Sequence, residues 1–228
     1  MTEIYLGVYD ALSAKIASDN DPDRTLFLSG YSMAKSKGLE DGQQSFELLE
    51  RTVNEILNVI PDTTKLIVDI DCGYGNLKRT LKVMNDLLVD AVLLEDQQED
   101  CKCCGHDDRV KVVSTDDAMK RIETACDYFG SNVIAKCCAY HKGITEVMNR
   151  LKEYSKLTKY LQVDGISDAN HIEKLGILYP ERMVHNWLMG GKSPNIDLHS
   201  LYEWGYAGVF HSNILIDSVI GELQKLTA

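Results

Sequence analysis

Short apolar segments, many of them rich in β-branched residues, alternate along the chain with amphipathic ones. Eight apolar segments predict strands at residues 4–8, 25–29, 66–71, 91–95, 133–138, 160–163, 182–184 and 208–211. Apolar residues at helical spacing predict helices over 46–60, 119–129, 144–154 and 214–226, and Ser114 begins a plausible N-cap for the second of these. Strands alternating with helices indicate a parallel sheet with right-handed crossovers. Eight repeats close most naturally into a (β/α)8 TIM-type barrel of the α/β class.

The composition is that of one globular domain, which we expect to span residues 1–228. Hydrophobic residues occupy 44% and charged residues 26% of the 228 positions, and no low-complexity stretch or charge block marks a linker. No window approaches the roughly 18 to 20 uninterrupted apolar residues of a membrane span, and the N-terminus lacks the segments of a signal peptide. We therefore expect a cytoplasmic protein without a membrane partner.

The charge balance is acidic, with 24 Lys and Arg against 35 Asp and Glu and a formal net charge of -11. This charge repels nucleic acid and anionic membranes at long range, so nucleic-acid binding is not expected. A small anionic substrate stays open, because a metal ion and a few local cations reverse the field inside one pocket. The seven cysteines form an odd set without the framework of a secreted scaffold, which indicates reduced thiols.

The most informative segment is residues 66–76, LIVDIDCGYGN, in which an apolar run ends in two carboxylates and a Gly-rich turn. Side chains alternate along a strand, so Asp69 and Asp71 are expected on one side of the same strand, at its C-terminal end. Two such charges repel each other unless a cation lies between them. Mg2+ is the expected cation, because it prefers oxygen ligands and one or two carboxylates suffice. Taken alone, the pattern also fits a solvated strand end.

Three further motifs accompany this segment. They are VYDALSAKIA at 8–17, LSGYS at 28–32 with GLED at 38–41, and LLEDQ at 93–97 followed by KCCGH at 102–106. Together the motifs closely resemble the isocitrate lyase and phosphoenolpyruvate mutase superfamily from about Val8 to about Leu215. Within it, they look most like the lyases of branched malates and methylisocitrate and like carboxyphosphonoenolpyruvate mutases.

The resemblance also bears on the architecture. It implies the same (β/α)8 barrel, here shortened at both termini, because relatives begin with an extra helix and end with one that protomers exchange. We expect a homo-oligomer, although the family's swapped tetramer needs that last helix.

The resemblance implies an acidic set around Mg2+, with Mn2+ as a possible substitute. Asp69 and Asp71, with Asp41 and Glu95, match this set. Four carboxylates converging from several strands and loops are costly to bury without a cation, which favours a metal independently of the resemblance. Scattered solvated acids are the alternative.

The resemblance further implies a substrate subsite after the second strand. Ser29 and Gly30 match the pair whose hydroxyl and backbone N–H groups bind one carboxylate of a 2-oxo acid, and Tyr31 closes over it. The alternative is a Ser-Gly turn without a ligand.

Cys104, Gly105 and His106 match the C-G-H of a loop after the fourth strand. The resemblance implies that Cys104 is a general acid, which protonates the carbanion left by cleavage. It also implies that Gly105 lies beside the substrate and that His106 is one of the catalytic groups. We expect neighbouring cations, namely Lys102, His106 and Arg109, to lower the thiol pKa. Two alternatives remain, an exposed loop without a chemical role or a structural zinc site. The zinc ligands would be Cys101, Cys103, Cys104 and His106.

The chain departs from the family at two strand ends. Lys136 stands where relatives carry an Arg, and Met189 where they carry a Glu that faces this Arg over the substrate. Lys136 keeps a charge but loses the planar fork that grips a carboxylate. At the same rim, Lys192 and Asn213 are candidate substrate-binding residues or plain barrel-end residues.

We interpret the chain as a Mg2+-dependent carbon–carbon lyase acting on a small 2-hydroxy or 2-oxo carboxylic acid, with a pyruvate- or glyoxylate-like product. The departures at Lys136 and Met189 predict a substrate whose distal part is less charged or more alkylated than that of 2-methylisocitrate. One alternative is P–C bond chemistry of the phosphoenolpyruvate mutase or phosphonopyruvate hydrolase type. Another is a metal-binding pseudoenzyme.

Overall fold

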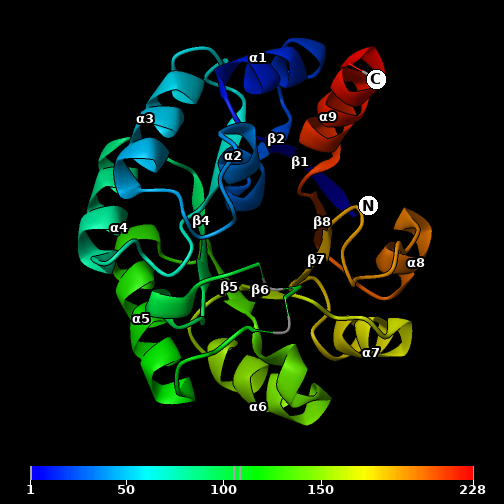
Figure 1. Ribbon diagram of the computed structural model, residues 1–228. Helices are drawn as coiled ribbons and strands as arrows, with labels where there is room; N and C mark the ends of the chain where they lie inside the picture. The colour runs from blue at the N-terminus through cyan, green and yellow to red at the C-terminus, as the bar shows by residue number, and fades with distance from the viewer. Residues whose placement is uncertain (1, 105, 108, 228) are drawn as a thin grey trace.

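Eight parallel strands form a closed barrel in chain order, with helices around it, which confirms the predicted (β/α)8 fold (Figure 1). The structure, a computed structural model, describes residues 2–104, 106–107 and 109–227. The strands are β1 (Glu3–Val8), β2 (Thr25–Leu28), β3 (Lys65–Asp69), β4 (Ala91–Glu95), β5 (Val133–Cys137), β6 (Tyr160–Val163), β7 (Met183–Trp187) and β8 (Gly208–His211). The helices are α1 (Ala11–Asn20), α2 (Gly30–Ser36), α3 (Phe46–Leu57), α4 (Leu77–Asp86), α5 (Thr115–Phe129), α6 (Ile144–Tyr154), α7 (Ala169–Leu178), α8 (Leu198–Glu203) and α9 (Ile214–Thr227), with short 3-10 turns η1 (Glu99–Cys101) and η2 (Ala139–Lys142). Across these ranges, no helix is both long and apolar enough to cross a membrane.

Two strands differ from their predicted bounds by more than one residue at the C-terminal end. β3 ends at Asp69, because Asp71 adopts a left-handed backbone conformation with φ 47° and lies in a turn. The expectation that Asp69 and Asp71 share one strand is therefore wrong. β7 continues to Trp187, beyond the predicted end at residue 184, because the polar His185 and Asn186 interrupt the apolar pattern while remaining buried.

Seven buried side chains fill the inside of the barrel, one from every strand except β6. They are Tyr5, Phe27, Ile67, Leu93, Ile134, Val184 and Phe210. The Phe210 ring packs 4.1 Å from that of Phe27 and 5.1 Å from that of Tyr5, measured between centroids. A larger core lies between the strands and the surrounding helices. The barrel is thus a packed core, and a site can form only above this filling, at the ends of the strands.

His185 points to the outer side of β7, where it is buried with its ring 6.0 Å from that of Tyr206. Burial lowers the pKa of His185 from 6.5 to about 4. Between these values the unfolded chain binds more protons, so the free energy of unfolding decreases as the pH falls, by up to about 3 kcal/mol. Because glutamine does not titrate, we expect His185→Gln to lack this decrease. Denaturant titrations between pH 7 and pH 4 measure the free energy of unfolding that shows it. The exposed His199→Gln is the control, and identical pH profiles for His185→Gln and wild type would contradict the assignment.

Candidate active site

A layer of polar side chains lies directly above the apolar filling of the barrel. Side chains two positions apart in a strand share a face, so the residue two positions after Phe27 or Ile67 also points inward. The layer formed in this way is buried and consists of Ser29, Asp69, Glu95, Lys136, Asn186 and Ser212. Side chains from adjacent strands of this layer are hydrogen-bonded to each other, as Ser212 donates to Asn186 at 2.6 Å. The strand alternation alone therefore gathers a polar floor from six strand ends.

Three carboxylates form an acidic cluster on this floor. Asp69, Asp71 and Glu95 each place one oxygen within 4.8 Å of the others. The turn at Asp71 helps to position Asp69, because the Asp71 backbone N–H donates to Asp69 Oδ1 at 3.0 Å. Burial raises the pKa of Asp69 well above its usual range, and the charges of Asp71 and Glu95 raise it further against the opposing effect of Lys136. The cluster therefore carries repulsion that a cation would relieve.

Gly30, the first residue of α2, leaves space beside the acidic cluster. A Cβ at this position would lie 3.4 Å from both Asp69 Oδ2 and Asp71 Oδ1. Asp71 Oδ1 is also buried without a hydrogen bond from the described residues. Carboxylate oxygens are the donors that Mg2+ prefers. The residues present therefore fit a hard divalent cation.

Lys102 lies against the acidic cluster. Its Nζ is 3.1 Å from Asp41 Oδ2, 3.2 Å from Asp71 Oδ1 and 3.6 Å from Glu95 Oε2. Burial opposes the charged form of Lys102, but the carboxylates outweigh it and raise its pKa well above the usual range. The fourth predicted acid, Asp41, thus joins the cluster through this ammonium group.

Lys136 is paired with carboxylates of the protein. Its Nζ lies 2.5 Å from Glu95 Oε1 and 3.0 Å from Asp164 Oδ2. Burial opposes ionisation of Asp164, yet Lys136 and His106 hold its pKa well below the usual range. Asn186 also donates to Asp164 at 2.9 Å. Lys136 therefore serves first as a counter-ion for two buried acids.

His106 joins two loops over the cavity. Its Nδ1 accepts a 2.8 Å hydrogen bond from the Lys192 backbone N–H, and its Nε2 lies 3.1 Å from Asp164 Oδ1. Because Nδ1 accepts, Nε2 carries the proton. A Cβ at Gly191 would lie 2.7 Å from Nδ1, so glycine is needed for this approach. His106 lines the cavity, with Nδ1 hydrogen-bonded and Nε2 in contact with Asp164 but without a hydrogen bond from the described residues.

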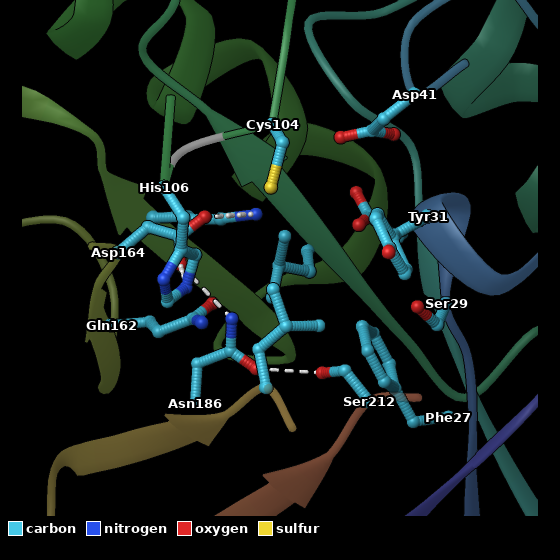
Figure 2. A pocket seen from close by; sticks show the side chains of 14 residues that line it. Phe27, Ser29, Tyr31, Asp41, Cys104, His106, Gln162, Asp164, Asn186 and Ser212 are labelled. Carbon is cyan, nitrogen blue, oxygen red and sulfur yellow. Dashed lines mark hydrogen bonds and ion pairs between the residues drawn. The ribbon is translucent and has the colours of Figure 1, made fainter. Parts of the chain in front are cut away.

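Cys104 points its sulfur into the cavity, opposite the polar floor (Figure 2). Burial raises the pKa of the Cys104 thiol to about 12, and Asp164 contributes in the same direction. The expectation of a lowered pKa is therefore wrong. One reason is that the neighbouring groups contact other partners: Lys102 contacts the acidic cluster, His106 contacts Asp164, and Arg109 contacts Asp107 at 2.6 Å.

The zinc alternative finds no support in the described part of the chain. There, Cys103, Cys104 and His106 do not gather into a group of three donors. Gly105 lies outside the described residues, and the side chain of Cys101 is likewise not described.

The other predicted residues divide into two groups. Ser29 and Tyr31 line the cavity. Lys192 and Asn213 are not among its lining residues, and Asn213 instead accepts from the Met189 backbone N–H at 2.8 Å and donates to its carbonyl at 3.0 Å. Met189 is 42% exposed, whereas the buried Leu188 lines the cavity. The apolar wall expected from Met189 is therefore formed by its neighbour, because the strand end turns Leu188 inward.

Sequence reasoning missed several polar lining residues: Gln162 on β6, Asp164 just after it, Asn186 and Ser212. A signal was present, since the apolar run at 160–163 ends in Asp164-Gly165 much as the run at 66–68 ends in Asp69. The cavity that these residues line measures only about 20 Å³, which holds one or two water molecules. The side chains that line the site thus leave little free space between them.

A family model described as phosphoenolpyruvate phosphomutase matches residues 2–228. The chain belongs to this family. This match confirms the family resemblance that the motifs predicted.

Curated relatives of this family member are named lyases. The chain is 38% identical over 113 residues to 2-methylisocitrate lyase of Shewanella oneidensis, covering 46% of this chain and 36% of that enzyme. It is 32% identical over 140 residues to isocitrate lyase of Haloferax volcanii, covering 59% and 40%. It is 26% identical over 213 residues to 2,3-dimethylmalate lyase of Eubacterium barkeri, covering 88% and 71%. The first two matches span well under two thirds of those enzymes.

Solved structures of the superfamily share the barrel. A 2,3-dimethylmalate lyase, described as a PEP mutase/isocitrate lyase superfamily member, superimposes with a TM-score of 0.87 at 25% identity, over 98% of this chain and 78% of that chain. An oxaloacetate acetylhydrolase in complex with 3,3-difluorooxalacetate gives 0.89 at 24% identity, over 98% and 79%. These likenesses establish that this phosphoenolpyruvate phosphomutase family member has the family's fold.

Proposed function

We propose that this protein is a Mg2+-dependent lyase that cleaves a carbon–carbon bond of a small 2-hydroxy carboxylic acid and releases a pyruvate- or glyoxylate-like 2-oxo acid. The observation that carries the proposal is that the Cys104 thiol lines the same cavity as Asp69, and that Asp69 belongs to a cluster of three carboxylates able to hold a metal ion. The names of the lyases to which the chain is similar support it.

The acidic cluster is the proposed metal site, with Asp69 and Asp71 as ligands and Glu95 and Asp41 around them. Mg2+, or Mn2+ in its place, would supply a Lewis acid that polarises the substrate oxygen and orients the substrate. The Ser29 hydroxyl already accepts from the Ser32 N–H as the N-cap of α2, so its own proton is free to donate to a carboxylate. Gly30 provides the space in which substrate oxygens approach the cluster.

Cys104 is the proposed general acid. With a pKa of about 12, its thiol keeps its proton at neutral pH, so the proton is present for donation and the sulfur is not a thiolate nucleophile. In the proposed cleavage, the 2-hydroxyl group loses its proton to solvent as it becomes an oxo group, and the electrons of the carbon–carbon bond pass to the departing carbon. That carbon takes the proton of Sγ, and the resulting thiolate regains a proton from solvent. Lys136 and His106 both contact Asp164 and keep its carboxyl group ionised. These contacts stabilise the buried charge of Asp164 within the site.

The proposed substrate carries few charges in its distal part. The Lys136 ammonium lies within 3.0 Å of Asp164 and closer still to Glu95, so a second substrate carboxylate would compete with them. Leu188, Phe27 and Leu93 add apolar surface to the cavity. Short alkylated 2-hydroxy acids therefore suit this site better than tricarboxylates do.

The test is a substrate panel measured with Mg2+ and with excess chelator. We expect metal-dependent formation of pyruvate or glyoxylate from alkylated malates, and a kcat/KM for 2-methylisocitrate lower by about tenfold or more. Phosphorus NMR with phosphonopyruvate tests the P–C alternative, and turnover there without C–C cleavage would overturn the proposal. Absence of turnover on every acid would favour the pseudoenzyme.

A further inference from the structure

Lys102 approaches the same oxygens that the proposed metal site would use. Its Nζ lies 3.2 Å from Asp71 Oδ1 and 3.6 Å from Glu95 Oε2. Glu95 has little remaining capacity, because its Oε1 pairs with Lys136 at 2.5 Å and its Oε2 accepts from Gln97 at 2.8 Å. Apart from Lys102, Asp71 Oδ1 receives no hydrogen bond from the described residues. The ammonium group is therefore the counter-ion of this oxygen.

We propose that Lys102 is an internal counter-ion that competes with the divalent cation for the acidic cluster, so that metal binding displaces its ammonium group. This inference rests on the metal site of the proposed function. Mg2+ binds carboxylate oxygens at about 2.0–2.1 Å, a distance at which an ammonium group cannot keep the same lone pair. Two cations on one buried oxygen also repel strongly in a low-dielectric site.

The position of Lys102 gives the exchange a structural consequence. Lys102 precedes Cys104 and His106 in the sequence, and both of these residues line the cavity. The carbonyl of Lys102 packs on Gly42, where a Cβ would lie only 2.8 Å away. The side chain is 6% exposed and reaches the cluster from outside the barrel floor. The Lys102 side chain is therefore one attachment between its loop and the acidic cluster, and its displacement by a metal ion would free that attachment.

The prediction is that Lys102→Met raises Mg2+ affinity. In calorimetric titrations of chelator-treated protein, we expect the Mg2+ dissociation constant of Lys102→Met to fall by about tenfold or more relative to wild type. Lys111→Met is the matched control, because it removes one charge from an exposed side chain of the same loop, and it should change the constant by less than about twofold. Without metal, Lys102→Met should also melt at a lower temperature than wild type, and Mg2+ should restore it.

A second measurement uses the wild-type protein and does not depend on folding of the variant. Mg2+ should increase the labelling of Lys102 by an amine-reactive reagent, as read by peptide mass spectrometry, while labelling of Lys111 stays constant. Equal or weaker Mg2+ affinity in Lys102→Met, or unchanged labelling of Lys102 when Mg2+ binds, would overturn the inference and leave the metal site standing. Absence of Mg2+ binding to wild type and variant alike would instead overturn the proposed metal site.

Discussion

Asp69→Ala is expected to abolish Mg2+ binding and to lower kcat/KM by about a thousandfold or more. A loss of this size corresponds to the several kcal/mol of transition-state stabilisation that a Lewis-acid metal supplies. The barrel should remain folded. Asp69 has a raised folded-state pKa, so its ionised form costs stability at neutral pH, and this cost increases as the pH rises through that pKa. Removing the carboxylate removes this stability cost. The gain offsets the loss of the hydrogen bond that the Asp71 N–H donates to Asp69. Calorimetry with Mg2+ and thermal melts in chelator measure the two effects separately.

Two companion variants sharpen this experiment. Asp69→Asn keeps an acceptor for the Asp71 N–H while losing the charge, so it should behave as Asp69→Ala does toward Mg2+. The exposed Asp62→Ala removes a charge of the same sign far from the cluster and should bind Mg2+ normally. A Mg2+ affinity of Asp69→Ala equal to that of the wild type would refute the site.

Cys104→Ser is expected to lower kcat by roughly 10²–10⁴ with little change in the affinity for a 2-oxo acid product, because a general acid acts in the transition state. A serine hydroxyl fills the same space but is a far weaker acid. The thiol pKa of about 12 adds a pH signature. The protonated form is lost only as the pH rises through this value, so kcat should show no alkaline decline due to Cys104 below about pH 11.

Cys126→Ser is the control for the thiol. Cys126 is half-buried in α5 and does not line the cavity, and its sulfur donates to the Leu157 carbonyl. Its turnover should match the wild type. Full turnover by Cys104→Ser would assign proton delivery to another group and strengthen the case for P–C chemistry.

The floor of the site follows from sequence wherever a strand end keeps the simple alternation. Ile67 with Asp69, and Leu93 with Glu95, place a carboxylate two positions beyond an apolar residue that fills the barrel. Local capping was equally predictable, since Ser114 accepts from the Asp117 N–H at 3.1 Å as the N-cap of α5.

Contacts between distant segments could not be derived in this way. Lys102 meets Asp41 across 61 positions of sequence, and no local pattern specifies which of several carboxylates a loop lysine will reach. The prediction of a lowered pKa for the Cys104 thiol was wrong for the same reason. A nearby cation in the sequence lowers a pKa only when its charge is not already paired, and pairing is decided by the closed conformation of the loop.

The contact between Gly191 and His106 limits how this barrel can be redesigned. Loop grafting on barrels treats each strand-to-helix connection as an exchangeable module. Here a side chain at position 191 would collide with the imidazole that the 102–107 segment inserts from the other side of the cavity. A donor loop for one connection would therefore have to bring its partner with it, and libraries that vary the two segments jointly should yield folded, closed sites far more often than libraries that vary either one alone.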